Sequence, residues 1–246
     1  MAAPLRVGVL GARGRMGAEV CHAVDDAADL RLVAAVDTGD DREQLCDAQV
    51  VVDFTTPDAV MDNISWCLDN DLHLVVGTTG FDDDRLATVG RLAAAHPATG
   101  VLVVPNFGIG AVLMMRFAAL AAPYFESAEI VELHHAGKVD APSGTARRTA
   151  EVIAQARRGR PSPDATTHSA VGARGADVAG VRVHSVRLSG LVAHQEVLLG
   201  GPGETLTIRH DSLARESFMP GVLLGIRWVV DHAGLTVGIE AALGLD

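Results

Sequence analysis

The stretch Val7-Gly8-Val9-Leu10-Gly11-Ala12-Arg13-Gly14-Arg15-Met16-Gly17 decides how the first hundred residues of this chain fold. A short apolar run typical of a buried strand leads directly into three glycines spaced three apart, and helical spacing follows through Val20 and Val24. This GxxGxxG pattern is a variant of the dinucleotide fingerprint. It needs a tight turn at Gly11, close approach of a pyrophosphate at Gly14 and close helix packing at Gly17.

A carboxylate at a suitable distance supports dinucleotide binding. The apolar run 32–36 ends in Asp37, about 20 residues after the glycines, where it would accept hydrogen bonds from the adenosine ribose. Asp37 favours NADH because it would repel a 2′-phosphate, whereas Arg13 or Arg15 could neutralise that phosphate, so we expect both NADH and NADPH to serve. A glycine-rich turn followed by an incidental aspartate is the alternative. The expected contacts from this region are Gly11, Ala12, Arg13, Gly14, Arg15, Met16 and Asp37.

Strands and helices alternate from the glycine turn to about residue 108. Apolar runs at 50–55, 72–76 and 101–104 predict three more strands, and helical spacing at 60–68 and 86–95 lies between them. Several of these strands end in small or polar residues, as in Asp53-Phe54-Thr55 and in Gly77-Thr78-Thr79-Gly80. The pattern predicts an α/β fold with a Rossmann-like, doubly wound parallel sheet and ligands at its carboxyl edge.

A second functional stretch runs Glu132-Leu133-His134-His135-Ala136-Gly137-Lys138-Val139-Asp140-Ala141-Pro142-Ser143-Gly144-Thr145-Ala146. Residues 130–133 predict the end of a strand and residues from 146 to 158 a helix, with Pro142 expected in its first turn. The backbone N–H groups and hydroxyls of Ser143, Gly144 and Thr145 then lie at a helix N-terminus, where a carboxylate or phosphate can bind, and Lys138 can add a positive charge.

Within this stretch one histidine is expected to be the acid, while its neighbour binds or orients a ligand. His134 and His135 point to opposite sides if the strand continues through both. The alternatives are structural histidines followed by a simple helix cap, or a metal site formed by His134, His135 and Asp140. Adjacent histidines lack the helical spacing of a zinc motif, so we expect no metal.

The rest of the chain predicts a smaller α+β domain, with a mixed, largely antiparallel sheet, that binds substrate and oligomerises. A helix containing Leu113 and Phe117 leads into it, residues 157–180 predict a long loop, and residues 181–188, 194–199 and 204–210 predict antiparallel strands. An apolar outer face on that sheet would pair with another copy, and we expect a homotetramer. The helix at 218–230 and the strand at 235–239 are expected to return to the first domain. The predicted domains are therefore 1–108 with 218–246 for dinucleotide binding, and 109–217 for substrate binding and oligomerisation.

Composition excludes several classes of function. The net charge of -11 over 246 residues argues against a nucleic-acid partner. No apolar run approaches the ~20 residues that span a bilayer, and the N-terminus lacks the apolar region of a signal peptide, so we expect no membrane partner and a cytoplasmic protein. Three scattered cysteines imply no disulfide framework.

With these motifs together, the chain resembles the bacterial 4-hydroxy-tetrahydrodipicolinate reductase family, also called dihydrodipicolinate reductase, in its shorter actinobacterial form. The resemblance covers nearly the whole length, and the ELHH stretch followed by KVDAPSGTA is its most specific part. It implies NAD(P)H-dependent reduction of the dehydrated form of 4-hydroxy-tetrahydrodipicolinate to tetrahydrodipicolinate, in lysine and diaminopimelate biosynthesis. Hydride would reach C4 of this cyclic dicarboxylate and a proton C3.

The resemblance also assigns roles to residues. It makes His134 the proton donor assisted by Lys138, and it makes His135, Gly144 and Thr145 substrate ligands. It places the nicotinamide against Gly77, Thr78, Thr79, Val104, Pro105, Asn106 and Phe107. Gly137 departs from the family, where many members have a histidine, so some cationic charge must come from elsewhere. A different nicotinamide dehydrogenase of small amino acids, or a dinucleotide sensor without turnover, are the competing interpretations.

Overall fold

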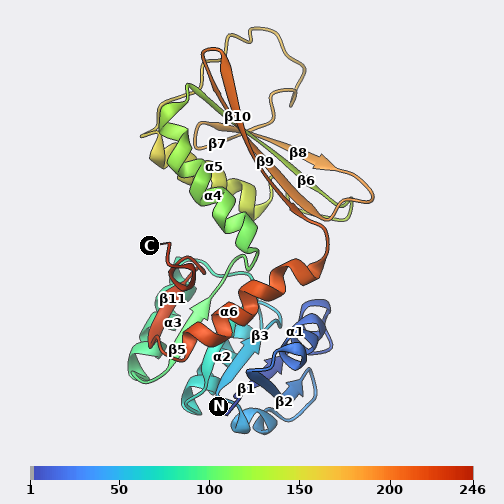
Figure 1. The fold of residues 1–246 in the computed structure, drawn as a ribbon, viewed down its shortest axis with the longest axis vertical. Coiled ribbons are helices and arrows are strands. Elements are labelled where there is room, and N and C mark those ends of the chain that lie inside the picture. Colours follow the sequence, from blue (N-terminus) through green and yellow to red (C-terminus); the bar gives the residue numbers. More distant parts are fainter. Residues whose placement is uncertain (1–2, 246) are drawn as a thin grey trace. The chain divides into compact units, whose positions relative to one another are not determined.

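The computed structural model describes residues 3–245, which form two compact units. Of the described residues, unit 1 comprises 3–108 and 218–245, and unit 2 comprises Ile109–Ser217. Figure 1 shows the elements of each unit in sequence colours. No helix among the described residues has the length and apolar character needed to cross a membrane.

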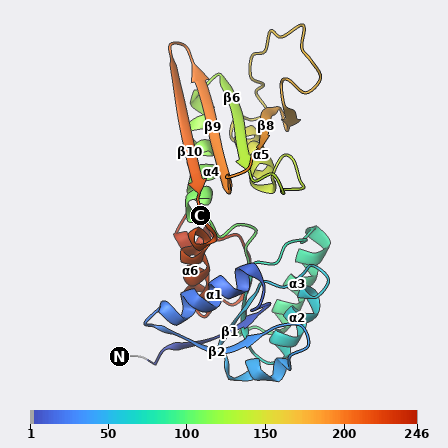
Figure 2. The same ribbon diagram turned by 90° about the vertical axis from the view of Figure 1, so that its right-hand side faces the viewer.

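Unit 1 contains a six-stranded sheet in which every pairing is parallel, in the order β11-β5-β4-β3-β1-β2. Its inner strands are nearly continuous runs of buried valine and leucine, as expected for a sheet covered on both faces. Helices α2 and α3 lie on one face and α1 and α6 on the other (Figure 2). The strands are β1 (Leu5–Leu10), β2 (Leu30–Val36), β3 (Val50–Asp53), β4 (His73–Val76), β5 (Gly100–Val103) and β11 (Gly234–Val237), and the helices are α1 (Arg15–Asp26), α2 (Val60–Asp69), α3 (Asp83–Ala95) and α6 (Met219–Val229).

The doubly wound parallel sheet predicted from the sequence is confirmed, with small differences at its edges. The strand expected over 50–55 ends at Asp53, because Phe54 and Thr55 leave the sheet where the Asp53 side chain binds the backbone N–H of Thr55. The sixth strand, β11, pairs with β5 and comes from the C-terminal segment. Helix α6 packs closely against the segment that follows β5, since a Cβ on Gly221 would lie 2.1 Å from the carbonyl oxygen of Phe107.

Unit 2 contains a five-stranded mixed sheet in the order β10-β9-β6-β8-β7, with α4 and α5 packed on one face. Apolar side chains of β6, β8 and β9, including Ile130, Val183 and Val197, alternate inward and form the core with side chains of these helices such as Ile153. The strands are β6 (Ser127–His134), β7 (Ala176–Val178), β8 (Val181–Arg187), β9 (Ala193–Gly201) and β10 (Glu204–Ser212), and the helices are α4 (Ile109–Ala121) and α5 (Gly144–Ala156). Single 3-10 turns cover Arg42–Asp47, Ala122–Tyr124, Arg215–Phe218 and Ala241–Leu243.

The mixed, largely antiparallel character of this sheet is confirmed, but two local predictions are wrong. Strand β8, expected to be antiparallel, pairs in parallel with β6, while β9 pairs with β6 and β10 in antiparallel register. The segment expected to be one long loop over 157–180 contains β7, which pairs with β8 at the edge. Three residues are too few for an alternating pattern, so β7 depends on its partner strand.

Candidate active site

The turn between β1 and α1 has the geometry of a phosphate-binding turn. Gly11 has a φ of 78°, a conformation that side-chain-bearing residues rarely adopt. Gly14 is the N-cap of α1 without any side-chain capping bond, and a Cβ on Gly17 would lie 2.0 Å from the carbonyl oxygen of Gly11. Ala12 is buried in the turn, and Arg15 and Met16 begin the helix. The first backbone N–H groups of α1 therefore remain available for a pyrophosphate.

Asp37 lies beside this turn and is already well supplied with donors. Its carboxylate accepts hydrogen bonds from the backbone N–H groups of Thr38 and Arg13, each at 2.7 Å, and these bonds lower the pKa of Asp37. The Arg13 guanidinium forms an ion pair with Asp40 at 2.8 Å. One of the two positive charges expected to meet a 2′-phosphate, that of Arg13, is thus already paired with a carboxylate at the surface of unit 1.

A cavity of about 650 Å³ joins these groups. It brings together Gly11, Arg13, Gly14 and Asp37 from the predicted set, and it adds residues that the sequence did not single out, notably Asp40, Arg42 and Asn63. A glycine turn, a helix N-terminus and a carboxylate around one cavity fit a dinucleotide. The full lining is Leu10, Gly11, Arg13, Gly14, Val36, Asp37, Thr38, Gly39, Asp40, Arg42, Phe54, Thr55, Thr56, Ala59 and Asn63.

The ends of β3 and β4 are braced by a buried carboxylate. Asp53 accepts hydrogen bonds from Thr78 Oγ1 at 2.7 Å and from the Asn63 amide at 2.8 Å. The Thr78 side chain is therefore engaged in the hydrogen bond to Asp53, while Thr79 is exposed. A Cβ on Gly77 would lie 2.2 Å from the Phe54 ring, so this position must be glycine for the ring to remain where it is.

The remaining residues predicted to contact nicotinamide follow β5. Val104 and Phe107 are buried, and the Phe107 ring lies 5.6 Å from that of Phe54. Pro105 is exposed, and Asn106 Oδ1 accepts a hydrogen bond from the backbone N–H of Gly108 at 2.8 Å. These residues form part of the carboxyl edge of the parallel sheet, where ligands of such folds bind.

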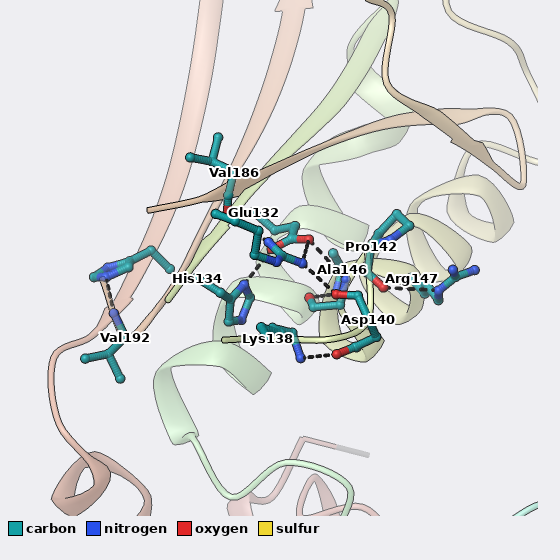
Figure 3. A network of polar contacts seen from close by, with 12 residues as sticks. Glu132, His134, Lys138, Asp140, Pro142, Ala146, Arg147, Val186 and Val192 are labelled. Carbon is teal, nitrogen blue, oxygen red and sulfur yellow. Dashed lines mark hydrogen bonds and ion pairs between the residues drawn. The ribbon is translucent and has the colours of Figure 1, made fainter. Parts of the chain in front are cut away.

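Unit 2 contains a network of polar and charged side chains at the end of β6 (Figure 3). His134 is the last residue of the strand, and its Nδ1 lies 2.5 Å from Glu132 Oε2. Glu132 is completely buried and also accepts two hydrogen bonds from Arg187, each at 2.8 Å, and one from the backbone N–H of Ser143 at 3.2 Å. From the sequence alone, no role was expected for Glu132 or Arg187. A charged residue at an inward position of an apolar strand was the signal available.

Burial and neighbouring charges set the ionisation of this pair. Burial tends to raise the pKa of Glu132, but hydrogen bonds from Arg187, Ser185 and His134 outweigh it and lower that pKa, so Glu132 is ionised. Burial lowers the pKa of His134, and the bond to Glu132 offsets only part of that effect. A carboxylate can only accept, so neutral His134 donates from Nδ1 and its Nε2 carries the lone pair.

Lys138 and His135 lie in the connection after β6. Lys138 Nζ forms an ion pair with Asp140 at 2.7 Å, and this bond lowers the pKa of Asp140. His135 is exposed and lies beyond the strand, so the expectation that the two histidines alternate across a continuing strand does not apply. Among residues 3–245 no three metal-binding side chains are grouped, and His134 and Asp140 bind Glu132 and Lys138.

The N-terminus of α5 contains both a cap and an open position. Ser143 is buried and its Oγ accepts the backbone N–H of Ala146 at 3.1 Å, which is the simple cap considered as an alternative. Pro142 precedes this cap, contrary to its expected place in the first turn. A Cβ on Gly144 would meet no atom within 4 Å, and Thr145 is half-buried beside it. Because packing does not require a glycine at 144, the space above it suits a ligand.

A parallel sheet with a glycine turn at its carboxyl edge in unit 1, together with a His-Lys site in unit 2, is the combination expected of a nucleotide-dependent oxidoreductase. The family model "Dihydrodipicolinate reductase, N-terminus" matches residues 5–107, and "Dihydrodipicolinate reductase, C-terminus" matches residues 110–243. The chain belongs to the dihydrodipicolinate reductase family.

Relatives agree with this assignment over their full length. The 4-hydroxy-tetrahydrodipicolinate reductase of Cutibacterium acnes is 63% identical over 245 residues, covering 98% of this chain and 100% of the relative. That of Mycobacterium marinum is 60% identical with the same coverage. The dipicolinate-bound dihydrodipicolinate reductase from Paenisporosarcina sp. TG-14 is 41% identical with a TM-score of 0.88, covering 97% of this chain and 99% of that one.

Proposed function

We propose that this protein reduces the dehydrated form of 4-hydroxy-tetrahydrodipicolinate to tetrahydrodipicolinate, in lysine and diaminopimelate biosynthesis. One observation supports this proposal most strongly. A chain that matches this family over both units has a cavity suited to a dinucleotide in unit 1, and it has the His134, Lys138 and Gly144 site in unit 2. A bound dinucleotide would supply a hydride, that is, two electrons together with the hydrogen that becomes bonded to C4 of the cyclic dicarboxylate. The residues of unit 2 bind the carboxylates and deliver the proton.

The substrate carboxylates are proposed to bind at the start of α5 and at Lys138. Backbone N–H groups of Gly144 and Thr145 lie in the first turn of a 13-residue helix, where an anion is stabilised by the helix dipole. Lys138 moves from Asp140 to a carboxylate, exchanging one charge partner for another. Ser143 contributes its position as the cap, while the exposed His135 can bind the second carboxylate.

His134 is proposed to be the proton donor. Reduction at C4 leaves negative charge at C3, and a positioned imidazolium can neutralise it during the same step. The hydrogen bond between Nδ1 and Glu132 fixes the ring, so Nε2 is the nitrogen that exchanges the proton. Lys138 assists because its positive charge stabilises the anion before it is protonated.

For the cofactor we propose that both NADH and NADPH are used, with NADH preferred. Gly11, Ala12, Arg13, Gly14, Arg15 and Met16 hold the pyrophosphate, and Asp37 binds the adenosine ribose. Asp37 and Asp40 place two carboxylates beside the cavity, and Arg13 is already paired, which favours a ribose without a phosphate. The nicotinamide is proposed to lie against Gly77, Thr78, Thr79, Val104, Pro105, Asn106 and Phe107.

A homo-oligomer, proposed to be a tetramer, would form through the outer face of the unit 2 sheet. Alternation along the strands places Val131, Leu133, Val186 and Leu198 on the face opposite α4 and α5. Val186 and Leu198 are more than one-third exposed. An apolar strip on an uncovered sheet face is a typical self-association surface.

The decisive experiment follows NADH and NADPH oxidation at 340 nm while the substrate is produced from pyruvate and aspartate semialdehyde by the preceding synthase. We expect oxidation that needs both precursors and is faster with NADH. His134→Gln should lower kcat by about 10²-fold or more, the usual contribution of a general acid, with dinucleotide affinity unchanged. Dinucleotide binding without turnover would instead support a sensor, and turnover of a simple amino or hydroxy acid another dehydrogenase.

A further inference from the structure

Two glutamate-arginine-histidine clusters lie on strand β6, and they differ in burial. Glu129 contacts Arg174 and His184, and its side chain is 27% exposed. Glu132 contacts Arg187 and His134, and its side chain is 0% exposed. Since side chains alternate along a strand, the two glutamates lie on opposite faces of the sheet. Only the Glu132 cluster includes the proposed proton donor.

A fully buried carboxylate is costly unless it is paired, so its retention needs an explanation. Arg187 supplies a bidentate pair to both oxygens of Glu132, and its Nη2 also donates to the carbonyl oxygen of Asp140 at 2.6 Å. Ser143 N–H binds the same carboxylate from the start of α5. Glu132 thus connects β6, β8, the loop holding Lys138 and the helix that carries Gly144.

The geometry points to Glu132, held by Arg187, as the positioning residue that keeps the proton of neutral His134 on Nδ1 and directs Nε2 to the substrate. The carboxylate is ionised and its oxygens are acceptors, so the only hydrogen bond available at 2.5 Å runs from Nδ1–H to Oε2. Without this acceptor the ring could rotate or carry its proton on Nε2, which would then be unable to accept one from solvent. Neither residue touches the substrate in this role.

Arg187 affects the pKa of His134 in the direction opposite to Glu132. It neutralises Glu132, and both its charge and that of Lys138 lower the pKa of His134, whereas Glu132 raises it. Asp140 forms an ion pair with Lys138, and through this pair it affects the charge that Lys138 presents to the His134 ring. These are the charged groups that face His134 from β6, β8 and the following loop. Removing Glu132 or Arg187 should therefore move the titration of His134 in opposite directions.

The first test measures the tautomer directly and does not depend on turnover. In protein labelled with ¹³C,¹⁵N-histidine, the His134 signals are assigned by their loss in His134→Gln, and the ring ¹⁵N shifts report which nitrogen is protonated. We expect Nδ1–H in the wild type and loss of that preference in Glu132→Leu, which has no acceptor for Nδ1–H, unlike a glutamine, whose amide oxygen would still accept. Glu129→Leu is the matched control from the same strand and should leave His134 unchanged. An unchanged His134 tautomer in Glu132→Leu would overturn the inference.

The second test rests on the proposed reductase function. We expect Glu132→Leu to lower kcat by about 10²-fold with a smaller change in KM. Its rate should begin to fall at a lower pH than that of the wild type. In Arg187→Gln the rate should begin to fall at a higher pH than in the wild type. Parallel shifts in both variants, or none, would contradict the assignment. A wild type without reductase activity would defeat the proposed function but leave the tautomer result standing.

A double variant separates positioning from simple stability. Glu132→Leu with Arg187→Leu leaves no buried unpaired charge, so the folded state should recover much of the thermal stability lost in either single variant. We expect kcat and the Nδ1–H preference to stay low in this double variant. Recovery of kcat together with stability would show that the pair acts only as a structural support. If Glu132→Leu alone does not fold, the double variant provides both measurements.

Discussion

At the scale of single residues, the ionisation of His134 depends on what is bound beside it. Burial lowers its pKa, Glu132 opposes part of this, and Lys138 and Arg187 add to the lowering, so the ring is neutral at pH 7 in the free chain. A dicarboxylate near Lys138 and the start of α5 adds negative charge and raises that pKa. The proton needed for reduction is then taken up together with the ligand.

We therefore expect dipicolinate to bind with uptake of a proton near neutral pH. Because the pKa of His134 is higher in the complex than in the free protein, affinity should rise as pH falls between these two pKa values and level off below the lower one. Isothermal titration calorimetry in buffers of different ionisation enthalpy measures the uptake. His134→Gln should bind without it, and wild-type affinity that does not vary with pH would disprove the linkage.

Asp40 is a second residue whose partner has a functional consequence. Its ion pair withholds the charge of Arg13 from the cavity, and hydrogen bonds from the Asp37 backbone and Arg13 lower the pKa of Asp40. Asp40→Asn should free Arg13 and improve kcat/KM for NADPH relative to NADH by about two- to fivefold, because an exposed ion pair contributes only a small free energy. Asp69→Asn removes a charge from α2 without touching Arg13 and should leave the ratio unchanged. An equal ratio in both variants would argue against this role.

At the scale of elements, two helix N-termini use glycine for different reasons. Gly17 lies in the first turn of α1 and is required by packing, since its Cβ would overlap the Gly11 carbonyl oxygen. Gly144 begins α5 where a Cβ would meet open space. The first glycine therefore supports the fold and the second supports ligand access.

Alanine substitutions should separate these two roles. Gly17→Ala is expected to cost about 1–3 kcal/mol of unfolding free energy, as overpacking usually does, and to weaken NADH binding. Gly144→Ala should leave the melting temperature nearly unchanged, because the added methyl group contacts nothing, yet raise KM for the dicarboxylate. Thermal unfolding and steady-state kinetics on both proteins provide the comparison. A large loss of stability in Gly144→Ala would reveal a packing role instead.

At the scale of the whole molecule, the outer sheet face of unit 2 is expected to govern assembly. Leu198 lies on this face near the middle of β9, with Glu129 opposite it on β6. Leu198→Glu should convert the oligomer to smaller species, because a carboxylate would be buried without a partner. Light scattering coupled to size exclusion measures this. Leu120→Glu on α4, which is 59% exposed, is the control expected to retain the wild-type mass.

Much of this molecule could be predicted because its signals are local. The glycine spacing at 11, 14 and 17 encodes a turn that needs no distant partner, and the valine runs of β3 and β4 indicate strands buried on both faces. The stretch from His134 to Thr145 also lies within one strand-to-helix connection. The motif in this stretch was therefore sufficient to indicate both the family and the candidate acid, His134.

What only the tertiary structure decided depends on partners far apart in the sequence. The parallel pairing of β8 with β6 brings Arg187 onto Glu132, and strand β7 exists only through β8. The pairing of Arg13 with Asp40 likewise depends on the loop after β2 meeting the glycine turn. Periodicity reports which face of an element is apolar, but it does not report which charged residue will meet another across a sheet. The sequence by itself thus determined the fold class, the family and His134, while tertiary structure determined how His134 is held.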